Sequence, residues 1–303
     1  LNTLKVAAVG IVLAPVLGVV IGIARLSTNW LVAKLAAGYV EVLRNTPLLL
    51  PLFLWYGLLT EALPGPRQAL SPVDGVFLSN RGLKIPGPAE DPAWIAFLVA
   101  LALGIGATVG LARWNRARQQ RTGRVLPMGR IGAGLVLGLP ALTLVAFGGA
   151  ALDMPVLQGF NFQGGLTLTP EFAALLFGLV VYTAAFIAEI VRSGILAVPH
   201  GQTEAARALG LSEARVLRLV VLPQALRVII PPTTSQYLNL TKNSSLAVAI
   251  GYPDFVSVAN TTINQTGQAI EGVAAIMAVY LTISLSLSLL MNWYNDRIAL
   301  KER

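Results

Sequence analysis

The sequence predicts an all-α, polytopic membrane protein with about seven transmembrane helices. Of the 303 residues, 55% are hydrophobic and 12% are charged, and the mean hydropathy is +0.70. Soluble domains carry about 25% charged residues, so a water-soluble domain of this length would have too few charges to solvate its surface. Seven apolar runs reach or approach the roughly 20 residues that a spanning helix needs. These runs are Val6–Ala24, Asn45–Thr60, Ala93–Ala112, Ile131–Leu152, Phe172–Ala188, Val228–Pro253 and Gly272–Asn295.

Two of the runs are less regular than the others. The second run is short and contains Pro47 and Pro51, but its helix can start earlier, which keeps it a credible span. The sixth run contains Pro231 and Pro232, which favour a broken or irregular helix start before Lys242. Between the second and third runs, the prolines and glycines of the stretch Pro64–Pro92 predict an extended loop outside the membrane.

Charges in the loops predict the orientation of the chain. Every second loop is basic, and the positive-inside rule makes those loops cytoplasmic. The loops Glu61–Asp91, Ala151–Glu171 and Gly251–Glu271 are balanced or acidic, so they are expected outside. The amino end is then outside and the carboxyl end cytoplasmic, and a further helix before Leu1 would make insertion easier to explain. The basic residues are Lys34, Arg44, Arg113, Arg116, Arg118, Arg121, Arg124, Arg130, Arg192, Arg207, Arg215, Arg218, Arg297, Lys301 and Arg303.

Composition excludes several kinds of site. The chain has no cysteine and one histidine, His200, which excludes thiolate and multi-histidine metal centres. The net charge of +8 arises beside apolar runs with few aromatics nearby, so it indicates topology and anionic-lipid contact rather than nucleic-acid binding. No Gly-rich loop ends in Gly-Lys-Ser/Thr, so the chain cannot bind ATP by that device. A membrane-embedded enzyme would need a nucleophile, a base or a metal cluster, and we find none and expect no catalytic residue.

A polar stretch between the fifth and sixth runs carries a spaced motif. Its residues are Glu204, Ala205, Ala206, Gly210, Val220 and Pro223. The residues before Gly210 are good helix formers, Gly210 is a natural stop, and Ser212 with Glu213 can begin a second helix. Ala205 and Ala206 are small enough for another protein to approach closely. This pattern predicts a rigid helix–turn–helix that docks a partner; the alternative is an amphipathic helix on the bilayer, with arginines at the headgroups.

This motif resembles the cytoplasmic docking loop of ATP-binding-cassette importer permeases. That loop has Glu-Ala-Ala, three residues, Gly, nine residues and Ile-x-Leu-Pro, and only Val220 departs from it, in place of Ile. Further segments are similar to the polar amino acid importer permeases, the histidine, glutamine and general L-amino acid type. These segments are Glu41–Leu49, Tyr182–Gln202, Leu222–Arg227 and Asn239–Ala247. The resemblance runs from Thr3 to the end except for roughly Pro64–Leu168, an insertion similar to that of the longer permeases for acidic and general L-amino acids.

The resemblance implies one transmembrane permease domain over residues 1–303, with an extra loop and two helices at 64–168 and an ATPase-docking loop at 193–223. It implies a subunit of an ATP-driven amino acid importer of the bacterial inner membrane, not an enzyme. The implied partners are two ATP-binding subunits, a second, similar but non-identical permease, and a periplasmic amino acid binding protein. ATP and Mg would be bound by the partner ATPase, so no cofactor is expected in this chain. The alternative is a secondary active amino acid transporter, which should show coupling-ion carboxylates at the midplane, and none is evident.

The sixth run contains a lysine among small polar residues. A charged lysine at the centre of a spanning helix costs about 2.5–3.5 kcal/mol, so Lys242 needs a partner or an aqueous cavity. Asn239, Asn243, Ser244 and Ser245 lie beside it, and a helix break there would free backbone amides for a substrate carboxylate. These five residues are therefore candidates for the substrate pathway. The alternatives are a lysine that extends to the membrane surface and polar residues that hold helices together.

Two acidic residues each precede an arginine by three positions. Glu189 with Arg192, and Glu41 with Arg44, have the spacing of an intrahelical ion pair, which is the default interpretation. Glu189 and Glu41 are also candidates for the substrate pathway or for gating, because charged groups near a span are often functional.

Glycine pairs four residues apart allow helices to pack closely. Three such pairs occur in the apolar runs, and they indicate no more than that close packing is allowed there. The pairs are Gly18/Gly22, Gly106/Gly110 and Gly134/Gly138.

Overall fold

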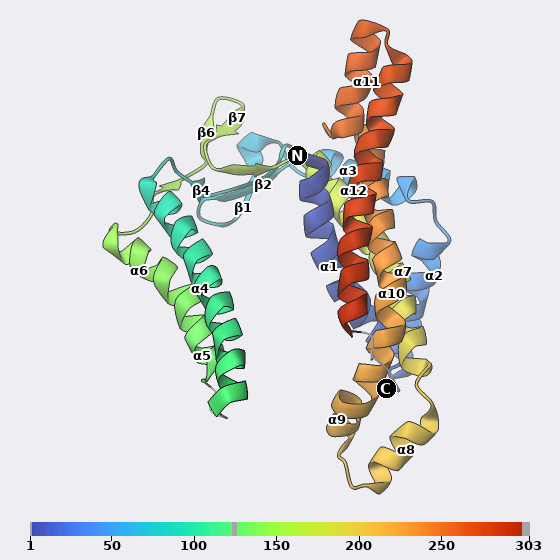
Figure 1. The fold of residues 1–303 in the computed structure, drawn as a ribbon. Coiled ribbons are helices and arrows are strands. Elements are labelled where there is room, and N and C mark those ends of the chain that lie inside the picture. Colours follow the sequence, from blue (N-terminus) through green and yellow to red (C-terminus); the bar gives the residue numbers. More distant parts are fainter. Residues whose placement is uncertain (1, 123–125, 299–303) are drawn as a thin grey trace. The chain divides into compact units, whose positions relative to one another are not determined.

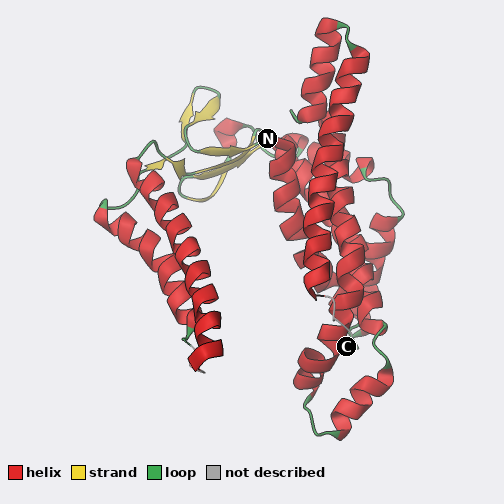
Figure 2. Cartoon of the chain, in the orientation of Figure 1, coloured by secondary structure: helices red, strands yellow, loops and turns green. Residues whose placement is uncertain are grey.

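The structure is a computed structural model that describes residues 2–122 and 126–298 and is mostly α-helical (Figure 2). Of the basic residues used to orient the chain, Arg124, Lys301 and Arg303 lie outside the described residues. The chain forms two compact units. One unit comprises Leu1–Ala62 with Thr169–Arg303, and the other is Leu63–Leu168.

The described residues contain six helices that are long and apolar enough to cross a membrane, and a bent helix pair that makes a seventh candidate. These elements fall on the seven predicted runs. In the first unit the helices are α1 (Asn2–Ala24), α2 (Trp30–Arg44), α3 (Leu49–Glu61), α7 (Pro170–Leu196), α8 (His200–Ala208), α9 (Glu213–Val216), α10 (Leu222–Asn243), α11 (Phe255–Thr266) and α12 (Ala269–Ile298), with a π-helical segment η3 (Leu217–Val221) and a 3-10 segment η4 (Ser244–Ile250).

Helix α7 is the centre of the first unit (Figure 1). In its most apolar 18-residue stretch 61% of the residues are buried, and the helix packs against α1, α2, α3 and α10. Small residues make these contacts close. A Cβ added to Gly18 of α1 would lie 2.7 Å from Ile187, and one added to Gly22 would lie 2.8 Å from Val191. The close packing that Gly18 and Gly22 allow is therefore present between α1 and α7.

The second predicted run differs from a simple span. Its residues form the bent pair α2 and α3, whose axes meet at 106°. Helix α2 also occupies most of the stretch that we expected to be a basic loop, and it begins at the N-cap Asn29, whose side chain accepts hydrogen bonds from the N–H groups of Leu31 and Val32. The helix ends before Pro47, because proline disfavours helical geometry in the residue that precedes it. The expectation of one helix extending back from Asn45 is wrong.

Helix α10 corrects the expected position of the irregular segment. Pro231 and Pro232 lie inside a continuous helix, in which the hydroxyls of Thr233 and Thr234 donate to carbonyls one turn earlier, at 2.7 and 3.2 Å. The α-helix ends after Asn243 and continues as η4. The irregular segment therefore follows Lys242 instead of preceding it.

Helices α11 and α12 form a hairpin beyond η4. The turn between them contains Gly267, whose φ of 74° is the left-handed conformation that favours glycine. A Cβ on Gly272 of α12 would lie 2.2 Å from Ile263 of α11, so the two helices touch at their turn. Beyond this contact α12 packs against α10, and none of its apolar window is buried within the chain.

The second unit contains short strands where we expected an extended loop. Strands β1, β2, β3 and β8 form one antiparallel sheet in that order, and two smaller hydrogen-bonded pairs are β4 with β5 and β6 with β7. Phe77 of β2 stacks on Phe162 of β7 with ring centroids 4.4 Å apart, and Phe162 is buried. The elements before the helices are η1 (Pro66–Gln68), β1 (Leu70–Val73), β2 (Val76–Ser79), β3 (Gly82–Ile85) and β4 (Gly87–Pro88), and those after them are β5 (Leu152–Asp153), β6 (Val156–Gln158), β7 (Asn161–Gln163) and β8 (Leu166–Leu168).

The two apolar runs of this unit form a helical hairpin. One arm is α4 (Pro92–Thr122), and the other comprises α5 (Met128–Ala133), the π-helical segment η2 (Gly134–Gly138) and α6 (Leu139–Ala146). The arms approach most closely where a Cβ on Gly104 would lie 2.4 Å from the carbonyl oxygen of Leu135. The pairs Gly106/Gly110 and Gly134/Gly138 face open space, with nothing within 4 Å of an added Cβ. The close packing that these two pairs allow is therefore not used within the described residues.

Candidate functional site

The spaced motif forms a helix, a turn and a second helix. Helix α8 ends before Gly210, whose φ of 77° places it in the left-handed region, so glycine is favoured there over any residue with a side chain. Ser212 is the N-cap of α9, as expected, although its side chain makes no capping hydrogen bond. Pro223 lies in the first turn of α10, directly after the π-helical segment η3.

The two arms of this loop are joined by an apolar cluster and an ion pair. Ala206, Val216 and Val221 are buried against one another. Arg207 donates two hydrogen bonds to Glu213 across the turn, at 2.7 and 3.1 Å, and they raise the pKa of Arg207 above its ordinary value. Because the ion pair is exposed and contributes little, the apolar cluster is the main reason that the loop is rigid.

The outer face of α8 is open to a partner. Glu204 and Ala205 are exposed, and His200 lies 3.5 Å from Glu204. Leu209 is 82% exposed, which is unusual for a large apolar side chain next to a turn. Ala206 is 4% exposed and packs inside the loop, because helix periodicity turns it toward α9. Of the two alanines, Ala205 is therefore the one on the open face.

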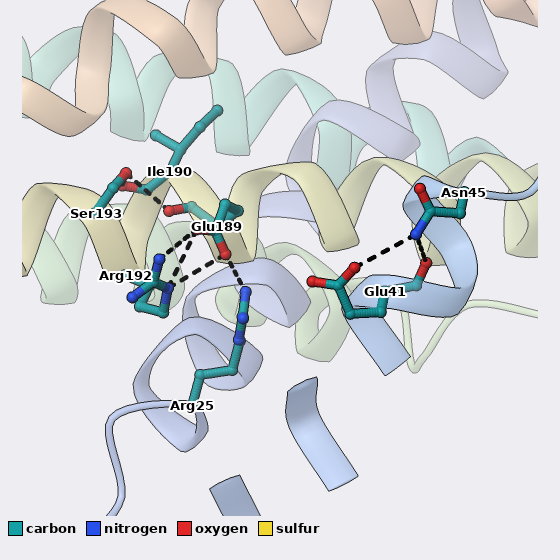
Figure 3. Close-up of polar contacts among 7 residues, drawn as sticks. All are labelled: Arg25, Glu41, Asn45, Glu189, Ile190, Arg192 and Ser193. Atoms are coloured by element: carbon teal, nitrogen blue, oxygen red, sulfur yellow. Dashed lines mark hydrogen bonds and ion pairs between the residues drawn. The ribbon is translucent and has the colours of Figure 1, made fainter. Parts of the chain in front are cut away.

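A charge cluster joins α1 to α7 (Figure 3). Arg192 donates to both carboxylate oxygens of Glu189, with its shortest hydrogen bond at 2.6 Å, so the default intrahelical pair is present. Arg25, from the end of α1, forms a second ion pair with Glu189. The side chains of Arg25 and Glu189 are 14% and 23% exposed. Glu189 is thus held by two arginines, of which the sequence pattern revealed only one.

The second acidic residue behaves differently. Glu41 is exposed and accepts a hydrogen bond from the Asn45 amide at 3.3 Å, and that amide also donates to the Glu41 carbonyl oxygen at 2.8 Å (Figure 3). In the part of the chain that the structure describes, Glu41 forms no ion pair with Arg44, and the default interpretation is wrong for this pair. The guanidinium of Arg44 instead lies over the ring of Phe186, 5.6 Å from its centre.

Of the five predicted pathway residues on α10 and η4, only some line a pocket, and that pocket is not the one beside Glu189. Lys242 and Ser245 line a mostly apolar pocket of about 640 Å³ beside α12. Asn239 is exposed, Asn243 is half-buried, and Ser244 is buried, with its hydroxyl donating to the Thr241 carbonyl at 2.7 Å. Glu189 lines a different pocket, so the structure does not bring the predicted pathway residues together.

Comparisons with known proteins then place the chain in a family. Residues 135–300 match the family of binding-protein-dependent transport system inner membrane components. Over its whole length the chain is 58% identical to the putative amino-acid ABC transporter permease protein YhdX of Escherichia coli K12, covering 78% of that protein. It is 52% identical to the general L-amino acid transport system permease protein AapQ of Rhizobium johnstonii, covering 76% of it. The chain belongs to this family of permeases.

A solved structure supports the fold of the permease. The permease resembles a chain in the crystal structure of an amino acid ABC transporter with histidines, with a TM-score of 0.56 over 97% of this chain and 90% of that one. The sequence identity is 21%, so this likeness concerns the fold alone. Family and fold together establish a multi-pass membrane subunit of an ABC transporter, which works with ATPase and permease partners and is not itself an enzyme.

Several polar residues of the permease were missed from the sequence. Arg25 is separated from Glu189 by 164 positions, and no local pattern connects them. Ser193, Ser235 and Gln236 line the same pocket as Glu189, although none belongs to an obvious motif. Among the residues of this pocket, the sequence pattern drew attention to Arg44, but it suggested Glu41 as its partner.

Proposed function

We propose that this permease carries amino acids, as part of an ATP-driven importer of the bacterial inner membrane. The observation that supports the substrate class most strongly is 58% identity over the whole chain to a permease named as an amino-acid transporter. AapQ, at 52%, is named for general L-amino acids, and BztB of Rhodobacter capsulatus, at 44%, is named for glutamate, glutamine, aspartate and asparagine. The secondary-transporter alternative has no support from these relatives.

We infer the finer assembly from the resemblance. It comprises two ATP-binding subunits, which bind ATP and Mg, a second, similar but non-identical permease, and a periplasmic amino acid binding protein. The basic loops and the carboxyl end would face the cytoplasm, in agreement with the positive-inside rule. This orientation places α8 and α9 on the side where the ATP-binding subunits work.

The docking loop would transmit the motion of the ATPase. Glu204, Ala205 and Leu209 offer an exposed face of mixed charge and apolar character. The cluster of Ala206, Val216 and Val221 makes the loop move as one body with α10. Val220 and Pro223 lie at the junction with α10, where they would pass the motion to the spans.

The substrate pathway is a further part of the proposal. Lys242 with Asn239, Asn243, Ser244 and Ser245 lies where α10 changes to η4, and such interruptions free backbone groups for ligands. Glu189 and Glu41 are the other candidates. The two ion pairs of Glu189 favour a role in holding the pathway's wall, since both of its oxygens already have partners.

The test is uptake by the complete importer in proteoliposomes. Radiolabelled L-amino acids are supplied one at a time, and ATP-dependent uptake should be seen for at least one of them. If none is taken up, the proposed substrate class is wrong. Glu204→Lys should reduce ATPase binding and uptake by at least about ten-fold, since it reverses a charge on the exposed face. Gly210→Val should do the same, because valine disfavours the φ of 77°. Gly65→Val is the matched control, with a φ of −65° and open space around it. Wild-type uptake by both docking variants would remove the docking assignment.

A further inference from the structure

A small pocket with several polar lining residues lies between α2, α7 and α10. Its volume is about 300 Å³, at the lower end of the range of ligand pockets, about 300–1,000 Å³. Arg44 lines it from α2, Phe186, Glu189 and Ser193 line it from α7, and Gln236 lines it from α10. All three helices belong to the same unit, so the pocket is a feature of one packed body.

The charges around this pocket do not balance. Glu189 forms ion pairs with Arg25, which directly follows α1, and with Arg192 of α7. Arg44 adds a third positive charge, and among the described residues it forms no ion pair. Three arginines therefore surround one carboxylate. Because Arg44 is exposed and lines the pocket, its guanidinium N–H groups are accessible to an anion that enters it.

The position of Arg44 suits an anion in the pocket. Its guanidinium lies over the Phe186 ring at 5.6 Å, a contact that restricts the side chain without using its hydrogen bonds. A planar guanidinium can bind both oxygens of a carboxylate, which gives direction as well as charge. The Ser193 oxygen and the Gln236 amide provide further polar groups on the opposite walls.

We propose that Arg44 binds a carboxylate of the transported amino acid in this pocket, an inference that rests on the proposed function. The carboxylate of the substrate would thus be the ion-pair partner that Arg44 does not have among the described residues. Glu189 with Arg25 and Arg192 forms the fixed wall of the site, and Arg44 is the group that meets the ligand. Two carboxylates are possible sources, the α-carboxylate and that of an acidic side chain.

The pocket of Lys242 is a weaker site for a carboxylate. It is about twice as large, at about 640 Å³, and its lining is mostly apolar, with Val256, Ile276, Met277 and Leu281 among the wall residues. A lysine ammonium also lacks the paired donors of a guanidinium. In this proposal the carboxylate is therefore bound by Arg44 and not in the pocket of Lys242.

The experiment measures equilibrium binding to the complete importer without its binding protein, so that the permease alone selects the ligand. Three probes separate the carboxylates: L-glutamine has only the α-carboxylate, L-isoglutamine only the side-chain carboxylate, and L-glutamine amide neither. In the Arg44→Gln variant, affinity should fall at least about ten-fold for the probe whose carboxylate is bound, a change of about 1.4 kcal/mol. Loss for L-glutamine identifies the α-carboxylate, and loss for L-isoglutamine identifies the side-chain carboxylate.

Controls separate contact from a general effect on α2. Arg44→Lys, which keeps the charge, should lose less affinity than Arg44→Gln. Lys34→Gln removes a positive charge from the same helix but not from the pocket, and should bind all probes as the wild type does. L-glutamine amide, measured by competition, should bind equally to wild type and Arg44→Gln. An equal loss for all three probes, or unchanged affinity in a correctly assembled Arg44→Gln complex, overturns the proposal. A wild-type importer that takes up no amino acid contradicts the proposed function instead.

Discussion

The most apolar 18-residue stretches of helices α7 and α12 have the same mean hydropathy and opposite environments. Within their apolar windows, 61% of the residues of α7 are buried and none of those of α12. Alanine and glycine occupy α7 where its neighbours approach, whereas α12 exposes large side chains such as Met277, Leu285 and Leu289. Hydropathy therefore indicates that a helix belongs in a membrane, and residue size indicates whether it packs inside its own subunit.

The difference has a consequence for assembly. A helix surrounded by its own chain is stabilised by close packing, because in a bilayer apolar side chains gain little from leaving lipid. A helix with an open face of large side chains can instead contact lipid or another subunit. Mutations should then act on α7 through the stability of the chain, and on the open face of α12 only weakly.

The largest expected effect is overpacking at the contact of α1 with α7. Gly18→Leu places a side chain where even a Cβ would be 2.7 Å from Ile187, and we expect destabilisation of about 3 kcal/mol or more. The melting temperature in detergent should fall and aggregation should increase. Gly38→Leu, on α2 with nothing within 4 Å of an added Cβ, is the matched control and should change the melting temperature little. Equal effects of the two substitutions would mean that α7 is not closely packed.

A smaller effect compares the same truncation on both helices. Leu179 of α7 is fully buried and Leu285 of α12 is 55% exposed. Leu179→Ala should cost about 2 kcal/mol, the lower end of the range for such truncations, since it leaves a cavity but apolar side chains gain little from leaving lipid, whereas Leu285→Ala should cost less than about 0.5 kcal/mol. Melting curves of the isolated permease in the same detergent test the difference. Similar shifts for the two variants would contradict the comparison between the helices.

The sequence predicted the spans because long apolar runs have one explanation in a chain with few charges. It also predicted the helix–turn–helix of α8 and α9, since Gly210 has a strong conformational preference at the turn. It could not predict the bend between α2 and α3, because Pro47 indicates where a helix ends but not the direction in which the chain continues. It placed the irregularity of α10 at Pro231, whereas Pro231 and Pro232 lie inside a continuous helix and the irregular segment η4 follows Lys242.

The candidate site was predicted less completely than the spans. The Glu189–Arg192 pair is local and was visible in the spacing, but its second partner Arg25 depends on tertiary packing. The burial of Ala206 follows from the position of α9, which a motif does not specify. The short strands of the insertion, such as β2 with Phe77, were missed because four residues are too few to distinguish a strand from a loop.

No residue in the most apolar stretch of α12 is buried within the chain, but a hydrogen bond connects α12 to Asp254, which lies between η4 and α11. Asp254 is 2% exposed, and one of its oxygens accepts the Ser257 N–H at 2.8 Å, which caps α11. Its other oxygen accepts the hydroxyl of Tyr280 of α12 at 3.3 Å. Tyr252 is the other titratable group beside this carboxyl. Burial raises the pKa of Asp254 above its ordinary value of 3.8, against the opposing effect of these hydrogen bonds.

The smallest expected effect is therefore a pH dependence of stability that belongs to α12. Between the unfolded pKa of 3.8 and the raised folded pKa, the folded chain binds more protons than the unfolded chain, so stability falls as pH rises. Asp254→Asn keeps an oxygen that can cap α11 and cannot ionise, so its melting temperature should fall less than that of the wild type as the pH rises above about 4. Asp91→Asn is a control of opposite sign, since the N–H groups of Ala151 and Ala93 lower the pKa of Asp91 and the stability it contributes is lost as pH falls. Identical pH profiles for wild type and Asp254→Asn would show that this carboxyl does not titrate differently in the folded chain, and that α12 is held by other contacts.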